Sequence, residues 1–212
     1  MPALFFDMDG TLTDSSPGIV RCVNHGLVAL GFSEVEEARI RAMIGLPLTT
    51  IYDSLIPGCD DALADLAVAA YRERFNDTGI FENSLFPGVV EGLDALRAGG
   101  YSLTIVTSKV VVAAQRVIEH FQIAGRFDGV FGPGLAERTS NKPELLARAL
   151  RQASSDRSLM AMVGDRKEDM AAARVHGVRG IGALWGYGSA AELSEATWLA
   201  GSWAEMVRYI LR

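Results

Sequence analysis

The chain has 212 residues, of which 49% are hydrophobic and 22% are charged, a composition typical of a folded globular protein. Its formal net charge of -6 and the lack of a Lys/Arg run argue against a nucleic acid polymer or a membrane surface as partner, because both require a basic face. No window reaches the ~18 apolar residues of a membrane span, and the N-terminus lacks the basic start of a signal peptide. Two cysteines are too few for a disulfide framework. We therefore expect a cytoplasmic protein, either a monomer or a homodimer.

Short apolar runs recur along the chain and predict strands that are buried on both faces of a sheet. The first run is Ala3–Phe6, which stops at acidic residues and glycine, and the later runs are 103–106, 129–131, 159–163 and 178–181. Helical patterns lie between them, for example over 87–98 and 144–152. This alternation predicts parallel strands joined by right-handed crossovers, and hence a three-layer, Rossmann-like α/β core.

Residues 16–83 interrupt the alternation, because they contain only helical patterns, separated by glycine and proline. We interpret this stretch as a small four-helix insertion after the first strand. The chain would then consist of a core, residues 1–15 and 84–212, and a helical domain, residues 16–83.

Polar residues follow the apolar runs at the points where the predicted strands end. They are Asp7, Asp9, Gly10 and Thr11 after the first run, Thr107, Ser108 and Lys109 after the second, and Gly164, Asp165 and Asp169 after the fourth. Lys142 begins the helix that precedes the fourth of these runs. Because ligands bind outside the carboxyl ends of parallel strands, we expect these side chains to converge on one edge of the sheet.

The acidic residues of this set suggest phosphoryl transfer assisted by a metal ion. A carboxylate attacks an anionic phosphate only when a divalent cation offsets the repulsion. Magnesium suits a site made of carboxylates, a backbone carbonyl and water, and Asp7, Asp165 and Asp169 would supply such a site. Asp9, two residues after Asp7, is placed to protonate the leaving oxygen and then to activate water.

The remaining polar residues suggest how the phosphate group is held. Gly10 allows the backbone to approach the phosphate closely. Thr11 and Thr107 offer hydroxyl donors, with Ser108 beside them, and Lys142 offers a fixed positive charge. We therefore expect Gly10, Thr11, Thr107, Ser108 and Lys142 to bind phosphate.

Four segments of the chain resemble, in the right order, the motifs of the haloacid dehalogenase-like phosphatases. Phe6–Leu12 resembles the first motif, Ile105–Lys109 the second, Lys142-Pro143 the third and Val163–Asp169 the fourth. The resemblance implies the family's α/β core and magnesium-dependent hydrolysis of phosphate monoesters. In many relatives a glycine precedes the lysine of the third motif, whereas Asn141 stands there in this chain, so the loop before Lys142 is expected to run differently.

The resemblance also implies a role for individual residues. Asp7 would be the nucleophile and a metal ligand, and Asp9 the general acid and base, with its backbone carbonyl on the metal. Thr107 and Lys142 would bind phosphate, Asp165 would bind magnesium, and Asp169 would bind the metal or orient its water shell. Residues 16–83 resemble the family's cap, in which Gly45, Leu46 and Pro47 would face the substrate and set specificity.

Several alternatives stay open at this stage. A small phosphorylated metabolite is the expected substrate, phosphoglycolate first and a nucleoside 5'-monophosphate second. A hexose-phosphate mutase and a catalytically silent binding protein are less favoured alternatives. Residues 185–189 would either border the active site or form an ordinary glycine-rich loop, and Lys109 would lie either beside the phosphate or in solvent.

Overall fold

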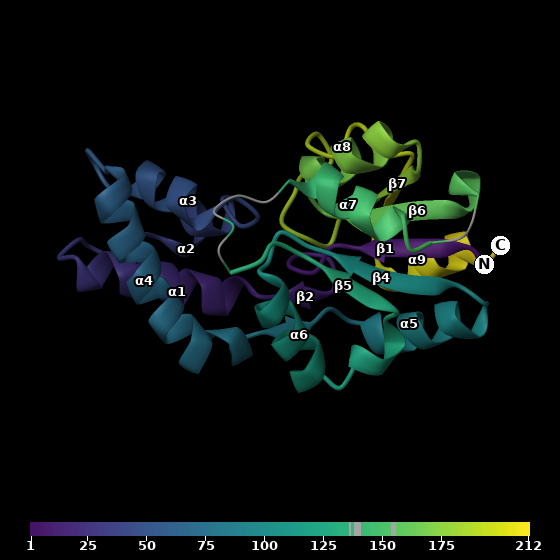
Figure 1. Cartoon of the computed structure of the whole chain (residues 1–212), viewed down its shortest axis with the longest axis horizontal. Coiled ribbons are helices and arrows are strands. Elements are labelled where there is room, and N and C mark those ends of the chain that lie inside the picture. The colour runs from purple at the N-terminus through teal and green to yellow at the C-terminus, as the bar shows by residue number, and fades with distance from the viewer. Residues whose placement is uncertain (136, 138–140, 154–155) are drawn as a thin grey trace. The chain divides into compact units, whose positions relative to one another are not determined.

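A computed structural model of the chain describes residues 1–135, 137, 141–153 and 156–212. It divides into two compact units, one formed by Met1–Asp14 and Leu85–Arg212 and the other by Ser15–Ser84 (Figure 1). The first unit is an α/β core, and the second is helical. A two-stranded sheet of β2 (Thr13–Asp14) and β3 (Ser84–Leu85) forms where the chain passes from one unit to the other and back.

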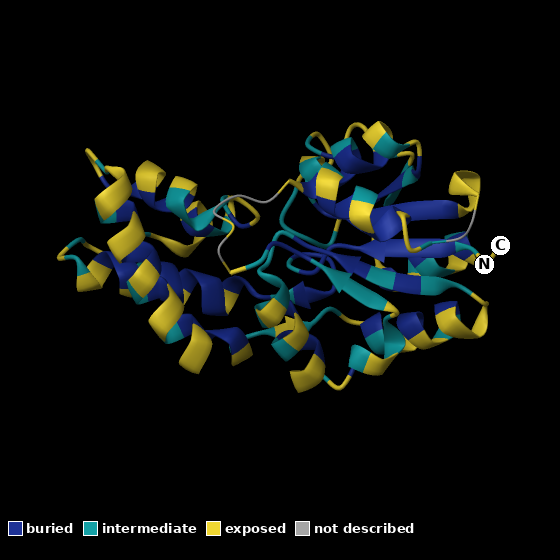
Figure 2. Ribbon diagram, viewed as in Figure 1, coloured by how far each residue is buried: buried dark blue, intermediate teal, exposed yellow. Residues whose placement is uncertain are grey.

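The core contains a six-stranded sheet among its described residues, and every neighbouring pair of strands is parallel. The strands are β1 (Ala3–Phe6), β4 (Ser102–Val106), β5 (Gly129–Phe131), β6 (Met160–Gly164), β7 (Arg179–Ala183) and β8 (Trp198–Ala200), in the order β5-β4-β1-β6-β7-β8. Helices cover both faces, so the predicted three-layer parallel α/β fold is confirmed. β1 is buried along its whole length, as its continuous apolar run predicted (Figure 2).

Two of the predicted strands begin one residue later than predicted, and one strand of the six-stranded sheet was not predicted. Leu159 is 51% exposed and ends a short 3-10 turn, η3 (Arg157–Leu159), so β6 begins at Met160. β7 begins at Arg179 rather than Val178. β8 was missed, although like the predicted β5 it is a three-residue apolar strand at an edge of the sheet.

The helices of the core lie on the two faces of the sheet as right-handed crossovers require. One face carries α7 (Lys142–Leu150) and α8 (Lys167–His176), and the other carries α5 (Val89–Ala98) and α6 (Val111–His120), with α9 (Trp203–Ile210) packed against α5. A further short turn, η2 (Ala124–Arg126), precedes β5. The α7 and α8 face encloses a buried apolar cluster that includes Phe5, Met162 and Leu146.

The order of strands determines where a ligand binds. β1 lies in the middle, with β4 paired on one side and β6 on the other. After β1 the chain forms β4 and β5 on one side and then returns to form β6, β7 and β8 on the other side. The strand order thus reverses at β1, and such a topological switch point is where open α/β sheets bind ligands. Asp7 is the residue that follows β1, so it stands at this point.

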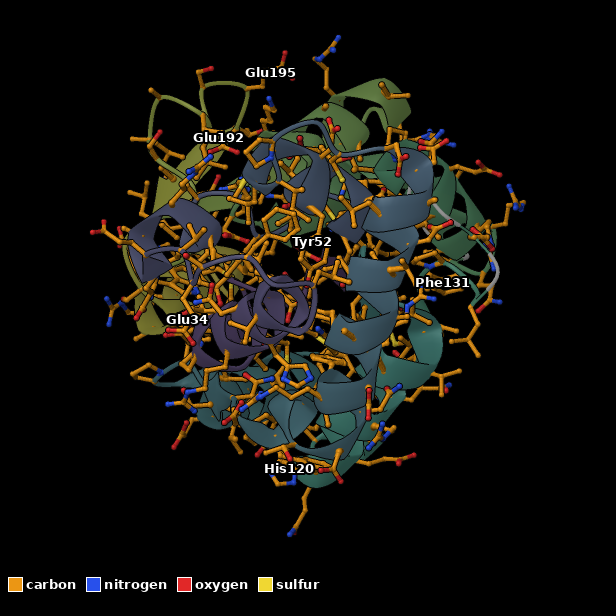
Figure 3. The ribbon with its side chains drawn as sticks, turned by 90° about the vertical axis from the view of Figure 1, so that its left-hand side faces the viewer. Glu34, Tyr52, His120, Phe131, Glu192 and Glu195 are labelled. Carbon is orange, nitrogen blue, oxygen red and sulfur yellow. The ribbon has the colours of Figure 1, made fainter. Side chains whose placement is uncertain are left out.

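The second unit, all of whose residues are described, contains α1 (Ser16–Ala29), α2 (Glu37–Arg41), α3 (Leu48–Leu55), α4 (Asp61–Asp77) and a short turn, η1 (Gly79–Phe81). Tyr52 is fully buried inside it and donates a hydrogen bond to the carbonyl of Val23, 3.2 Å away (Figure 3). Arg74 of α4 and Glu82, which follows η1, form an ion pair of 2.7 Å within this unit. Within the described part of the whole chain, the helices fall short of the length and apolarity that a membrane span requires.

Candidate active site

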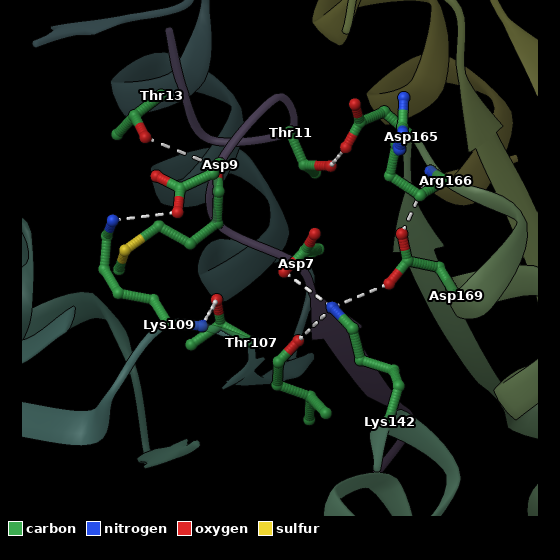
Figure 4. Close-up of polar contacts among 12 residues, drawn as sticks. Asp7, Asp9, Thr11, Thr13, Thr107, Lys109, Lys142, Asp165, Arg166 and Asp169 are labelled. Carbon is green, nitrogen blue, oxygen red and sulfur yellow. Dashed lines mark hydrogen bonds and ion pairs between the residues drawn. The ribbon is translucent and has the colours of Figure 1, made fainter. Parts of the chain in front are cut away.

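A buried ammonium group organises the carboxyl edge of the sheet. Lys142, only 4% exposed, lies with its Nζ 2.7 Å from Asp7 Oδ1 and 2.8 Å from Asp169 Oδ1 (Figure 4). The same nitrogen donates a hydrogen bond of 3.2 Å to the carbonyl of Val106, the last residue of β4. Burial lowers the pKa of Lys142, but the charges of Asp169 and Asp7 raise it more, so the amine stays protonated.

Three carboxylates share this region, and together they carry more charge than the lysine balances. One oxygen from each of Asp7, Asp165 and Asp169 lies within 4.8 Å of the others. Burial raises the pKa of Asp165 to about 8, helped by the nearby charges of Asp7 and Asp169, and burial likewise raises the pKa of Asp169. Three ionised carboxylates beside one ammonium leave two negative charges, which a divalent cation would compensate.

The loop after β1 wraps tightly around Asp165. Gly10 has a φ of +86°, and a Cβ built on it would lie 2.2 Å from Asp165 Oδ2. Any other residue would therefore be strained and would collide with the carboxylate. Thr11 donates from its hydroxyl to Asp165 Oδ1 at 3.1 Å. The predicted close approach of the Gly10 backbone is thus an approach to Asp165.

Residues 185–189 border this site rather than forming a loop remote from it. The backbone N–H of Tyr187 donates to Asp165 Oδ2 at 2.8 Å, and a Cβ on Gly186 would lie 2.3 Å from the Cβ of Asp165. Trp185 donates its indole N–H to the carbonyl of Thr11 at 3.0 Å. The glycines of this loop allow the backbone to pass beside the buried carboxylate.

A second indole reaches the same carbonyl from the C-terminal helix. Trp203 of α9 donates to the Thr11 carbonyl at 3.0 Å and stacks on Phe6, with ring centroids 5.5 Å apart. Sequence reasoning missed Trp203, although the apolar face of the last helix signals that one side of this segment is buried.

Asp9 lies apart from the three clustered carboxylates. Lys109 Nζ is 2.8 Å from Asp9 Oδ2, and its side chain is only 8% exposed, so Lys109 is not a solvated lysine. Thr107, which is 1% exposed, accepts a hydrogen bond of 3.1 Å on its hydroxyl oxygen from the backbone N–H of Lys109. Ser108 lies between them and is half-buried.

The other predicted site residues lie in two further places. Asn141 caps α7 by accepting a hydrogen bond from Glu144 N at 3.2 Å, which fixes Lys142 at the first position of the helix. The residues before it, 138–140, lie outside the described residues. Gly45, Leu46 and Pro47 belong to the second unit, where Leu46 is 37% exposed. Their role in specificity stays a prediction.

Comparison with known proteins identifies the family. A model of the haloacid dehalogenase-like hydrolases matches residues 4–183. The chain belongs to this family, as its motifs predicted, and it is a hydrolase of the phosphatase type.

Individual relatives agree with this assignment. The chain is 39% identical over 192 residues to a 5'-nucleotidase of Pseudomonas aeruginosa, covering 91% of this chain and 86% of that protein. It is 30% identical over 215 residues to a phosphoglycolate phosphatase of Vibrio vulnificus, covering 97% and 94%. The crystal structure of a predicted phosphatase from Clostridium acetobutylicum superposes with a TM-score of 0.91 at 31% identity, covering 99% of this chain and 98% of that one.

The raised pKa of Asp165 predicts how the stability of the metal-free protein depends on pH. The folded state keeps a proton on Asp165 up to about pH 8, whereas the unfolded state releases it near pH 4, so the free energy of unfolding falls as pH rises between these values. Asp165→Asn removes the titrating carboxyl group and with it this fall in the free energy of unfolding. The Thr11 hydroxyl is able to rotate and accept a hydrogen bond from the new amide. We expect the variant to be more stable than wild type by roughly 1–3 kcal/mol at pH 8, and by less at pH 5.

Urea unfolding in the presence of a chelator at both pH values measures this difference. Asp53→Asn, at an exposed position of α3, is the control and should show no such pH dependence. A variant that is no more stable than wild type at pH 8 would contradict the interpretation of Asp165 as a strained, metal-binding carboxylate.

Proposed function

We propose that this phosphatase hydrolyses small phosphate monoesters through an aspartyl-phosphate formed on Asp7. The observation that carries the proposal is that Asp7 is the carboxylate of the cluster with access to solvent, at 7% exposed, whereas Asp165 and Asp169 are each 0% exposed. Both oxygens of Asp165 accept hydrogen bonds, and those of Asp169 face Lys142 and the Arg166 N–H. Asp7 is therefore the group best placed to reach a substrate.

The residues of the cluster fit a magnesium ion. Asp7, Asp165 and Asp169 provide the oxygen ligands and the excess negative charge that a hard divalent cation requires, and we assign the backbone carbonyl of Asp9 as a further ligand. A bound magnesium ion would offset the repulsion between the Asp7 carboxylate and the phosphate and would stabilise charge on the phosphoryl oxygens.

The neighbouring polar groups would hold the phosphate against Asp7. Lys142 provides a positive charge that is fixed by its two carboxylates. The Thr107 hydroxyl oxygen already accepts a hydrogen bond from the Lys109 N–H, so its single hydrogen stays available for a phosphate oxygen. Ser108 and the backbone of Gly10 and Thr11 would complete the phosphate site.

Asp9 is proposed as the general acid and base. Protonated Asp9 would donate its proton to the leaving oxygen while Asp7 attacks phosphorus, so that an alcohol leaves and the aspartyl-phosphate forms. The resulting Asp9 carboxylate would then take a proton from water as that water attacks phosphorus, which releases inorganic phosphate and restores Asp7. Release of phosphate distinguishes this function from that of a mutase, which returns an isomeric phosphate ester.

Nucleoside 5'-monophosphates and phosphoglycolate are the two substrate candidates, and we favour the nucleotides. Identity to the reported 5'-nucleotidase is 39%, against 30% to the reported phosphoglycolate phosphatase. Phosphoglycolate also carries a carboxylate that requires a cationic partner. In the second unit Arg21 and Arg74 both pair with Glu82, at 2.7 Å each, so each of these two guanidinium groups already has an acidic partner. Cytoplasmic location and a monomeric or dimeric state stay predictions.

Removal of the metal should abolish turnover. Without a cation, nothing would offset the repulsion between the Asp7 carboxylate and a phosphate dianion or stabilise charge on the phosphoryl oxygens. We expect phosphate release to stop when excess chelator is added and to return when magnesium is added beyond the chelator. Calcium, which prefers more ligands at longer distances, is the control and should restore less activity. Full turnover in excess chelator would refute the metal requirement.

Substitution should separate the roles of the two aspartates that follow β1. Asp7→Asn removes the nucleophile, so both turnover and the covalent intermediate should be lost. Asp9→Asn keeps the nucleophile but should lower kcat by roughly 10²- to 10⁴-fold. Rapid acid quench with labelled substrate should detect protein-bound phosphate in wild type and not in Asp7→Asn. Label retained by Asp7→Asn would assign the nucleophile to another residue.

The substrate preference rests on the higher identity to the 5'-nucleotidase and on the acidic partner that Arg21 and Arg74 already have. We expect kcat/KM for nucleoside 5'-monophosphates to exceed that for phosphoglycolate by more than about tenfold, which corresponds to ~1.4 kcal/mol in transition-state binding. The measurement uses both substrates under identical magnesium and salt concentrations. A preference for phosphoglycolate would show that a cationic side chain of the protein binds its carboxylate, and phosphoglycolate would then replace the nucleotides as the proposed substrate.

A further inference from the structure

The ion pair between Lys109 and Asp9 uses only one of the two carboxylate oxygens. Lys109 Nζ lies 2.8 Å from Asp9 Oδ2, and the two side chains are 8% and 16% exposed (Figure 4). Asp9 Oδ1 is buried and has no hydrogen-bond partner among the described residues. A buried acceptor that lacks a partner is costly, and such atoms in native proteins commonly belong to functional groups.

The backbone on both sides of this pair is held in place. On the Asp9 side, the Gly10 N–H donates to the Thr13 carbonyl at 2.8 Å. On the other side, the Lys109 N–H donates to the Thr107 hydroxyl oxygen at 3.1 Å. Lys109 approaches Asp9 from the loop that follows β4, the strand paired with β1.

We propose that Lys109 is a positioning residue for Asp9. The ammonium group of Lys109 pairs with Oδ2 of Asp9. Oδ1 is therefore the oxygen that transfers the proton to the leaving oxygen. The inference rests on the proposed function, in which Asp9 is the general acid and base. Lys109 itself forms and breaks no bond in either step of the reaction.

The proposal makes the contribution of Lys109 depend on the leaving group. An alkoxide leaves only if it receives a proton, so a misdirected Asp9 should slow the cleavage of alkyl phosphates. Nitrophenolate leaves without a proton, so its ester should be nearly insensitive. The parameter kcat/KM covers the steps up to the first phosphoryl transfer, and it therefore excludes the later hydrolysis of the aspartyl-phosphate, which is common to all substrates.

The test compares kcat/KM for adenosine 5'-monophosphate, phosphoglycolate and p-nitrophenyl phosphate in four variants of the full chain. Lys109→Met should lower kcat/KM for the better of the two alkyl esters by about 10- to 100-fold, and for the nitrophenyl ester by less than about threefold. Lys109→Arg keeps the positive charge and should recover most of the activity. Asp9→Asn should show the same dependence on leaving group, and adding Lys109→Met to it should cause little further loss, because both changes disable one step.

Lys167→Met is the matched control, because Lys167 is an exposed lysine at the start of α8. Its kcat/KM should be unchanged for all three esters, and melting temperatures of all variants identify any loss through misfolding. Equal losses on alkyl and nitrophenyl esters in Lys109→Met, or losses additive with Asp9→Asn, would overturn the inference, because Lys109 would then bind the phosphate. If Asp9→Asn shows the leaving-group dependence and Lys109→Met does not, the inference is wrong while the proposed function stands. If the wild-type protein hydrolyses none of the three esters, the proposed function itself is wrong.

Discussion

The buried ammonium of Lys142 is the interaction on which the site depends. It joins groups from four elements of the core: Asp7 after β1, Asp169 in α8, the Val106 carbonyl of β4 and the lysine itself on α7. Removing one partner of a buried ion pair leaves an uncompensated charge and typically costs about 3–5 kcal/mol. The ammonium thus connects the carboxyl ends of β1 and β4 with the starts of α7 and α8. It compensates one of three carboxylates, so the same arrangement that stabilises the edge also leaves it ready for a cation.

The carbonyl of Thr11 is a second fixed point, and it connects the nucleophile loop to the end of the chain. Two indole N–H groups donate to this one oxygen, each at 3.0 Å. A carbonyl has two lone pairs, so both donors are accommodated, and the tryptophans gain the partner that a buried indole needs. Trp203 is 1% exposed and packs against Gly92, where a Cβ would approach its ring to 2.8 Å. The last helix therefore supports the loop that carries Asp7 and Asp9.

The sequence predicted the parts of this structure that have a strong local pattern. β1 was predicted residue by residue, because a strand buried on both faces is a continuous apolar run that ends abruptly at Asp7. The two-residue strands β2 and β3 are too short for any periodicity, and β8 was missed although β5, of the same length, was predicted. The cluster of Asp7, Asp165 and Asp169 could be expected because parallel strands end at one edge.

Contacts between side chains of different loops were not predictable in this way. The pairing of Lys109 with Asp9 and the approach of Trp203 to Thr11 depend on the conformations of the loops that carry Asp9, Lys109 and Thr11, and these loops have no period that would predict them.

The different environments of Asp7 and Asp9 explain why two carboxylates only two residues apart take different roles. Asp7 shares the ammonium of Lys142 with Asp169 and lies near Asp165, so its surroundings keep an excess of negative charge and attract a cation. Asp9 faces the ammonium of Lys109, and its carboxylate lies outside the cluster of three. A second divalent cation would gain little there, because the local charge is already balanced. Lys142, on a helix, and Lys109, in a loop, thus give the two aspartates different surroundings. Asp7 is suited to bind the metal and the phosphate, and Asp9 is suited to transfer protons. The environment of each carboxylate, rather than the residue type, determines its role.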